Sequence, residues 1–400
     1  MSALERAYRD ERAAVLATIT RRLGGDLALA EDVVQDAFVA AAVEWDRRGA
    51  PDRPGAWLTT TAWRKALDRL RHERVADAHA ADLAPPVSYV LDVDFERSSL
   101  DDDQLAMLFT CCHHALAAEA RMALTLRSVA GLTVPEIARA FLSSEQAMER
   151  RLTRARRKVT DAAIPFRVPP DERLPERLAG VLRVIYLVYT EGHGGVRDDM
   201  CEEAIRLARL LARLMPDEPE VLGLLALLLV TDARRPARVA DDGALVSLEE
   251  QDRSRWDTAQ IAEGAGVLER ALRLGRYGPY IVQAAIAALH SRASTWEATD
   301  WPQIAGLYAE LARLDPSPVV TMNRAVAVGF AVGAQAGLAI LDELQPDPRL
   351  DHYQPLHAAR AELLRRAGDA EAADAAYATA IALADSDTQR TALERRRDRR

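Results

Sequence analysis

The sequence contains few cysteines, few aromatic residues and no long apolar run. Its three cysteines, Cys111, Cys112 and Cys201, cannot build a disulfide framework in 400 residues. Aromatic residues make up only 5%, and strand-like runs are scarce, so an all-β fold is excluded and helices are favoured. No apolar stretch reaches the roughly 18 residues of a membrane span, and the N-terminus is charged from its start. We expect a cytoplasmic, helical protein with no membrane segment.

Motifs for catalysis or metal binding are also missing. Cys111, Cys112, His113 and His114 are consecutive, and because neighbouring side chains on a helix diverge by about 100°, they cannot close one zinc shell. The glycine-rich segment 191–195 lacks the Lys-Ser/Thr of a phosphate-binding loop and the pattern of a dinucleotide site. We therefore predict no enzyme activity, no metal and no cofactor.

The charge of the chain is unevenly distributed, although its net value is −9. Residues 64–74 hold five basic side chains against two acidic ones, and residues 145–158 hold six against two. Between these stripes, residues 77–103 carry eight carboxylates, one arginine and a Pro-Pro pair. A single charge run is usually a solvated face, but the order basic, acidic, basic predicts two binding elements joined by an acidic linker.

A helix with a carboxylate face is predicted from Ala30 onwards. The segment AEDVVQDAFVAAA puts its apolar residues on one stripe and Asp32, Gln35 and Asp36 on the opposite one. Two carboxylates four residues apart repel each other unless a basic partner covers them. This face is therefore interpreted either as a docking surface or as a plain solvated face.

A second helix is predicted over AWLTTTAWRKALDRLR, where apolar residues recur every fourth position after the turn-rich loop at 45–55. Trp57 and Trp63 could each stack on an unpaired base, because every base has a π face. The alternative is that each tryptophan fills the core.

A helix-turn-helix is predicted over residues 133–159. Thr133 and Glu136 have the spacing of a capping box, and Ser143 and Ser144 begin a second helix. The apolar stripe of that second helix leaves other side chains to project, in the manner of a recognition helix with arginines for phosphate and guanine. Such basic helix pairs also occur in plain bundles. The projecting or capping residues are Ser144, Gln146, Glu149, Arg150, Arg151 and Arg154.

In this order the motifs resemble RNA polymerase sigma factors of the extracytoplasmic-function type. AEDVVQDAFVAA is similar to the helix that binds core polymerase, PGAWLTTTAWRKALDRLR to the −10 reading helix, and LTVPEIARAFLSSEQAMERRLTRARRKV to the −35 helix-turn-helix. The chain also resembles the subgroup that carries a TPR-like C-terminal extension. The implied fold is all-α: a region 2 helical bundle at 1–76, an acidic linker at 77–103, a region 4 helix-turn-helix at 104–164 and a TPR-like solenoid at 171–400.

The resemblance implies core RNA polymerase and promoter DNA as partners. The residues implied for core polymerase are Asp32, Gln35 and Asp36. Those implied for the −10 element are Arg47, Arg48, Trp57, Trp63, Arg64, Lys65, Arg69 and Arg71. Those implied for the −35 element are the six residues of the helix-turn-helix named above.

The C-terminal part is predicted to form helical pairs. In residues 361–384, Gly368, Ala372, Tyr377 and Ala380 match the small and aromatic knobs of a TPR pair. A turn signal at 241–243 allows one small β-hairpin among the helices. A polar cluster is either a site for a protein partner or ligand, or a structural ion-pair network. Its members are Asp232, Arg234, Arg235, Asp252, Arg253, Trp256 and Asp257.

The sequence leaves three possible functions for the protein. The first is an alternative sigma factor whose C-terminal domain regulates or completes its activity. The second is a helix-turn-helix regulator with a TPR-like sensor, which would bind its operator without core polymerase. The third is an enzyme that hydrolyses its substrate with Glu191, His193 and the polar cluster. Dependence on core polymerase separates the first two, and turnover unrelated to DNA would reveal the third.

Overall fold

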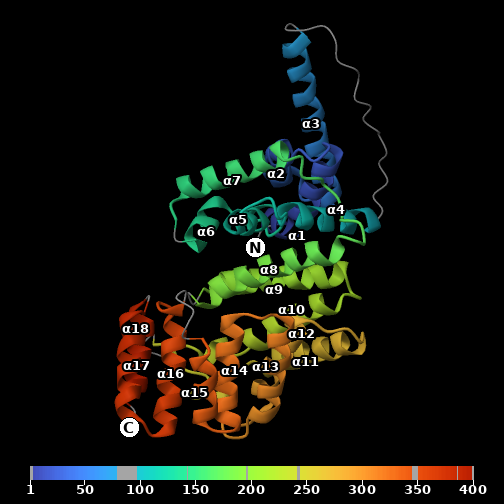
Figure 1. Cartoon of the computed structure of the whole chain (residues 1–400). Coiled ribbons are helices and arrows are strands. Elements are labelled where there is room, and N and C mark those ends of the chain that lie inside the picture. Colours follow the sequence, from blue (N-terminus) through green and yellow to red (C-terminus); the bar gives the residue numbers. More distant parts are fainter. Residues whose placement is uncertain are drawn as a thin grey trace. The chain divides into compact units, whose positions relative to one another are not determined.

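The computed structural model in Figure 1 describes residues 3–78, 97–141, 143–194, 197–240, 244–344, 350–384 and 386–398. These residues form helices and no strand, so the predicted all-α class is confirmed. The chain separates into two compact units, Met1–Leu214 and Met215–Arg400, called unit 1 and unit 2 below. Most of the predicted acidic linker, residues 79–96, lies outside the described residues.

Unit 1 contains nine of the labelled helices. They are α1 (Ala3–Arg22), α2 (Leu27–Arg48), α3 (Pro54–Ala78), α4 (Arg97–Cys111), α5 (Ala118–Ser128), α6 (Val134–Ala140), α7 (Glu145–Asp161), α8 (Leu174–Gly194) and α9 (Asp198–Leu214). The last two belong to this unit although the sequence prediction placed them in the C-terminal domain. The predicted domain bounds remain a proposal.

Buried apolar side chains support the helices of unit 1. Helix α1 contributes Leu16 and Ile19 and α3 contributes Leu58, all of them fully buried. Leu124 of α5 and Leu152 of α7 are also buried. Because each helix contributes its apolar side to a core, its polar side remains for binding.

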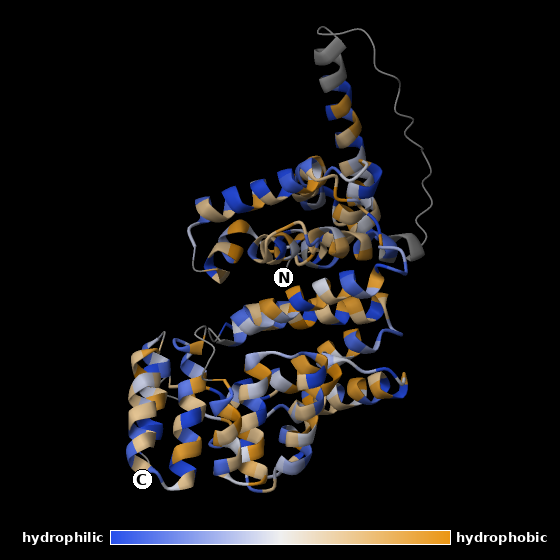
Figure 2. Ribbon diagram, in the orientation of Figure 1, coloured by the Kyte–Doolittle hydropathy of each residue, from blue (hydrophilic) through white to orange (hydrophobic). Residues whose placement is uncertain are grey.

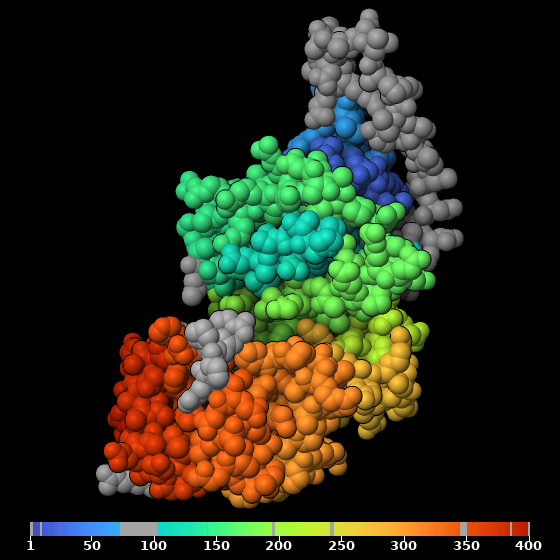
Figure 3. Space-filling view, in the orientation of Figure 1, coloured from blue at the N-terminus to red at the C-terminus, as the bar shows by residue number. Residues whose placement is uncertain are grey.

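Unit 2 contains α10 (Pro219–Asp232), α11 (Thr258–Arg273), α12 (Pro279–Arg292), α13 (Trp301–Leu314), α14 (Pro318–Ala331), α15 (Ala334–Asp342), α16 (Gln354–Ala367), α17 (Ala370–Ala382) and α18 (Asp387–Arg397), with short 3₁₀ turns η1 (Arg235–Ala237) and η2 (Arg253–Arg255). Several of these helices begin with proline, whose fixed φ and missing N–H suit a helix start. In the space-filling view of Figure 3, the orange and red segments of this unit lie against one another.

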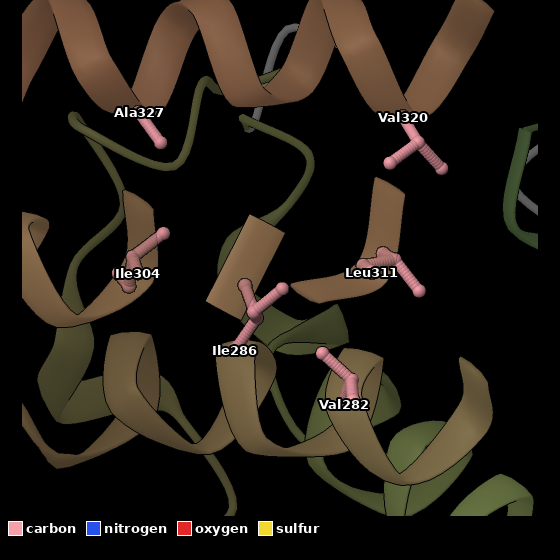
Figure 4. Close-up of a cluster of buried hydrophobic side chains, with 6 residues drawn as sticks. All are labelled: Val282, Ile286, Ile304, Leu311, Val320 and Ala327. Carbon is pink, nitrogen blue, oxygen red and sulfur yellow. The ribbon is translucent and has the colours of Figure 1, made fainter. Parts of the chain in front are cut away.

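The core of unit 2 is built from successive helices, as Figure 4 shows. One of its clusters consists of six buried side chains: Val282 and Ile286 of α12, Ile304 and Leu311 of α13, and Val320 and Ala327 of α14. Helices α14 and α15 approach so closely that a Cβ at Gly337 would lie 2.5 Å from the carbonyl oxygen of Ala325. Only glycine fits at that contact.

The predicted features of the last helical pair are in place. Gly368 ends α16 with φ of 82°, and Tyr377 of α17 is buried with its hydroxyl donating to Glu362 at 3.2 Å. That the helical pairs of unit 2 are TPR-like remains a prediction. At the expected hairpin, Val239 and Leu245 form one antiparallel bridge. The turn between them, residues 241–243, lies outside the described residues.

Candidate nucleic-acid interface

The helix-turn-helix has the caps that the sequence predicts. Thr133 and Glu136 form a reciprocal capping box, with the Thr133 backbone N–H donating to Glu136 Oε2 at 2.7 Å. At the start of α7, Ser144 Oγ accepts from the Ala147 backbone N–H at 3.2 Å. Ser144 therefore acts in this structure as the N-cap of α7 and satisfies one of the free backbone donors of its first turn.

The face of α7 opposite its buried stripe is open. In Figure 2 the hydrophilic residues of α7 gather along one side of the helix. Arg150 and Arg154 are exposed there and make no ion pair with any described residue. Gln146 and Glu149 of the predicted −35 set are also exposed on the helix, as is Ser144 at its cap. We call Gln146, Glu149, Arg150 and Arg154 the α7 face.

Arg151 differs from the other predicted −35 residues. It is half-buried, it pairs with Glu119 at 2.9 Å, and its guanidinium lies 5.7 Å from the centre of the Phe141 ring. Arg151 is thus turned toward its own unit and is not part of the open α7 face.

The carboxylates of α2 are not free. Arg69 of α3 donates to Asp32 at 3.1 Å and to Asp36 at 2.9 Å, while Gln35 stays exposed. Arg69 is therefore the basic partner that the two carboxylates require, although the sequence analysis assigned it to promoter DNA. A single arginine fork bridges two side chains one helical turn apart, which aligns α2 with α3.

Two valines that the sequence analysis missed lie next to these carboxylates. Val39 is 60% exposed and Val43 is 55% exposed, on the same side of α2 as Asp36. They border a surface hollow of about 660 Å³ that Arg47 and Lys65 also line. The signal was present in the sequence as two β-branched apolar residues four positions apart and off the buried stripe. We call Asp32, Gln35, Asp36, Val39 and Val43 the α2 face.

The two tryptophans assigned to the −10 element are packed against the protein. Trp63 is only 9% exposed, with the guanidinium of Arg22 5.5 Å from its ring centre, so its ring packs against the protein here, and its role in base stacking stays a prediction. Trp57 is half-buried and meets Trp45 edge to face at 5.5 Å. Both rings contribute to the bundle, which is the alternative that the sequence left open.

The basic residues assigned to the −10 element are mostly at the surface. Arg47, Arg48, Arg64 and Arg71 are exposed, and Lys65 is half-buried. Arg48 pairs with Glu44 at 3.1 Å, and Arg71 pairs with Asp68 at 3.5 Å. Arg64 has no ion pair among the described residues.

A buried carboxylate joins α2 to the helix-turn-helix. Glu31 is 7% exposed, accepts from Ser128 Oγ at 3.1 Å and forms an ion pair with Arg156 of α7. Arg12, also buried, donates to the carbonyl oxygen of Arg127 at 2.9 Å. No sequence pattern indicates these bonds, because their partners lie about a hundred residues apart.

The predicted polar cluster of unit 2 is held together by internal bonds. Asp232 is buried and accepts from Arg235 at 3.1 Å and from Gln260 at 3.0 Å. Arg253 donates to the carbonyl oxygens of His290 and Ala293. These contacts favour the interpretation as a structural network, and a site there remains untested.

The remaining members of that cluster act at helix starts and in the interior. Asp252 caps η2 and Asp257 caps α11, each through its carboxylate. Trp256 is buried with Arg253 4.6 Å from its ring centre, and Arg234 is half-buried. Burial, followed by the nearby Arg234 and Arg253 charges, lowers the pKa of His290 to about 4.

The described residues form neither a cluster of metal ligands nor a membrane-spanning helix. Within the part of the chain that the structure describes, no three His, Cys, Asp or Glu side chains gather as a metal site would require. Nor does any helix in that part combine the length and apolar character needed to cross a bilayer. All three cysteines are buried free thiols, and burial raises the pKa of Cys112 to about 11.

Comparison with known families matches three segments of the chain. Sigma-70 region 2 matches residues 8–75, and sigma-70 region 4 matches residues 106–159. A family of unknown function, DUF6596, matches residues 177–272. The two sigma matches contain the α2 face and the α7 face, respectively.

Comparison with known proteins finds relatives of two kinds. The uncharacterized protein R00370 of Rhizobium meliloti is 46% identical over 374 residues, which cover 90% of this chain and 87% of that protein. The probable ECF RNA polymerase sigma factor SigI of Mycobacterium tuberculosis is 33% identical over 180 residues, 42% of this chain and 58% of SigI. The ECF RNA polymerase sigma factor SigJ of the same organism is 31% identical over 156 residues, 36% of this chain and 46% of SigJ. The match thus spans about half the length of these two sigma factors.

Proposed function

Because this chain belongs to the extracytoplasmic-function type of alternative sigma factors, with a helical C-terminal extension, we propose that its two open faces bind different partners during transcription initiation. The α2 face docks on core RNA polymerase, and the α7 face reads the −35 element of the promoter. The exposed cations of α3 contact the −10 element. A sigma factor is not itself an enzyme, so these surfaces act by binding alone.

The observation that carries the proposal is the state of Arg150 and Arg154. Both guanidinium groups lie exposed near the middle of α7, without an ion pair among the described residues. Arginine binds guanine and phosphate through paired N–H donors, so an uncompensated pair at this position suits a major groove. The capped start of α7 adds the positive end of a helix dipole toward phosphate.

The α2 face has the composition of a protein-docking surface. Two exposed valines beside carboxylates combine apolar area with charge, and apolar side chains supply most of the free energy in the centre of an interface. The bridge from Arg69 leaves Asp32 and Asp36 partly exposed, so they can still meet a basic partner surface.

The C-terminal extension is proposed to regulate or complete the activity of the promoter-binding part, through a protein partner or ligand of its own. Paired helices of the kind found in unit 2 offer long surfaces for protein segments. Comparing promoter-directed transcription by residues 1–214 with that of the full chain tests this role. Higher activity of the shortened chain would mean inhibition by the extension, lower activity would mean support, and equal activity with equal core affinity would contradict the proposal.

The test of core docking is promoter-specific transcription in vitro with purified core polymerase. The double variant Val39→Glu, Val43→Glu should lose core binding and transcription, because charge replaces the apolar area of the α2 face while neither side chain supports the fold. Val332→Glu in unit 2 is the matched control, since Val332 is 76% exposed and far from this face in the sequence. Unchanged co-purification of the double variant with core polymerase would remove the α2 face from the proposal.

The same assay separates the competing function. A helix-turn-helix regulator would bind its DNA site without core polymerase and would not initiate transcription with it. Specific binding to duplex DNA by the full chain alone, with no promoter-dependent transcript in the presence of core enzyme, would therefore favour the regulator and overturn the roles assigned to both faces.

A further inference from the structure

A second pocket lies in unit 1, away from both proposed binding faces. It has a volume of about 390 Å³ and forms where the end of α4, the proline-rich segment 165–170 and the start of α8 meet. Three prolines contribute to its wall. Its titratable lining residues are His113, His114, Arg167, Arg173, Glu176 and Arg177. We call this the joint pocket, because segment 165–170 joins the helix-turn-helix to the helices that follow.

The charge around the joint pocket is not balanced. Three guanidinium groups face one carboxylate, Glu176, which leaves an excess of two positive charges. Arg167 and Arg173 are exposed and make no ion pair among the described residues. Arg177 is anchored by donating to the carbonyl oxygen of Phe109 at 2.7 Å. Cations gathered without counter-charge repel one another, so a bound anion would lower the energy of this arrangement.

The two histidines add a flat surface to the pocket. The rings of His113 and His114 stack with their centres 4.3 Å apart. His113 accepts from the Ala115 backbone N–H at its Nδ1 atom, which leaves Nε2 to carry the ring proton and donate. Such a surface provides a hydrogen-bond donor and a place for a planar ring.

We propose that the joint pocket binds the phosphate group of a small phosphorylated molecule that carries a planar ring. An excess of two positive charges matches a phosphate, which carries about −1.5 to −2 charges near neutral pH, better than a single carboxylate. The arginine fork bonds phosphate oxygens in pairs. The volume lies in the range of small-ligand sites, and proline walls make a concave hollow rather than the open, convex surface that duplex DNA requires.

Occupation of the joint pocket would have a structural consequence. Arg167 belongs to the joining segment, Arg177 to α8, and His113 to the turn after α4. A phosphate that contacts all three would add a second link between α8 and the end of α4, beside the bond from Arg177 to Phe109. The pocket thus gives a small molecule a way to stiffen the connection that follows the −35 reading helix.

Calorimetric titration of the full chain tests the proposal, with ADP and inorganic pyrophosphate as the probes. We expect ADP to bind, Arg173→Ala to weaken binding about tenfold, and the double variant Arg167→Ala, Arg173→Ala to weaken it further. Arg183→Ala is the matched control, because Arg183 is an exposed arginine of α8 outside the pocket. Thermal unfolding of each variant shows that the fold is retained.

Two comparisons make the result decisive. ADP should bind more tightly than pyrophosphate, and His113→Ala should remove that difference, since the ring contact is then lost. Equal affinity for the two probes would overturn the ring contact. Absence of binding by both probes, or equal losses in Arg173→Ala and Arg183→Ala, would overturn the pocket. If only duplex DNA bound in an Arg173-dependent manner, the pocket would be a contact for the DNA backbone and the proposal would be wrong.

Discussion

The two helices assigned to promoter DNA, α3 and α7, have similar basic sequences but different surroundings. On α7 the exposed arginines Arg150 and Arg154 have no counter-charge among the described residues. On α3, Arg69 is bound to two carboxylates of α2, and Trp63 is buried. A basic stripe therefore identifies a binding surface only where the fold leaves its charges uncompensated.

The difference has a geometric origin. On α7, the side chains that pair with other helices are Arg151 and Arg156, and both lie off the exposed side that carries Arg150 and Arg154. Helix α3 packs on α1 and α2, and the polar side of α2 meets α3 at Arg69 through Asp32 and Asp36. The four predictions below test this contrast, beginning with the largest expected effect.

Trp63→Ala should destabilise the protein more than any other change on α3. The ring is buried, and removing a large aromatic side chain from a core costs about 4 kcal/mol in the free energy of unfolding. Urea unfolding followed by circular dichroism measures this loss. Trp57→Ala is the comparison, and it should cost less because Trp57 is half-buried. Equal, small losses for both variants would show that Trp63 is not a core residue.

Glu31→Ala should destabilise unit 1 by about 3 kcal/mol, because the change leaves the Arg156 cation and the Ser128 hydroxyl unpaired in the interior. Glu44→Ala is the matched control, since Glu44 pairs with Arg48 at the surface and should contribute less than about 1 kcal/mol. Chemical unfolding of the two variants provides the measurement. Similar losses for both would mean that Glu31 is not a buried link between α2 and α7.

The sequence predicted the local features of the molecule well. The capping box at Thr133, the cap at Ser144 and the apolar stripe of α7 follow from spacing along one helix, and each is present. The all-α class and the sigma factor family were also accessible from ordered motifs. The two caps and the apolar stripe depend on residues close together on one helix, where helical geometry alone determines which side chains share a face.

The tertiary contacts were beyond the reach of that reasoning. The pairing of Arg69 with Asp36 spans 33 residues and that of Glu31 with Ser128 spans 97. No periodic pattern specifies which helix packs on which. The sequence therefore could not show whether the Trp63 ring is buried or exposed. The joint pocket was missed for the same reason, because its arginines and histidines come from segments that are distant in the sequence.

Arg150→Ala and Arg154→Ala should each weaken binding of the polymerase holoenzyme to promoter DNA by about 1–3 kcal/mol, without loss of stability. Arg157→Ala is the control on the same helix, since Arg157 is exposed but pairs with Asp161 at 3.3 Å near the end of α7. Competition binding across promoter variants measures the effect. A relaxed preference at one −35 position identifies a base contact, and a uniform loss identifies a phosphate contact. No loss in either variant would contradict the role of the α7 face.

Arg69→Ala should have the smallest effect of the four. Its two ion pairs are partly exposed to solvent, so their loss should lower the free energy of unfolding by less than about 1 kcal/mol. Because the guanidinium of Arg69 is already bound to Asp32 and Asp36, Arg69→Ala should change promoter opening little. Arg64→Ala on the same helix removes an exposed cation that has no ion pair among the described residues, so it should impair opening more. Permanganate footprinting of the −10 region measures opening for both variants. A larger defect for Arg69→Ala than for Arg64→Ala would show that Arg69 leaves its carboxylates to bind DNA, and the contrast between α3 and α7 would then hold only for the free protein.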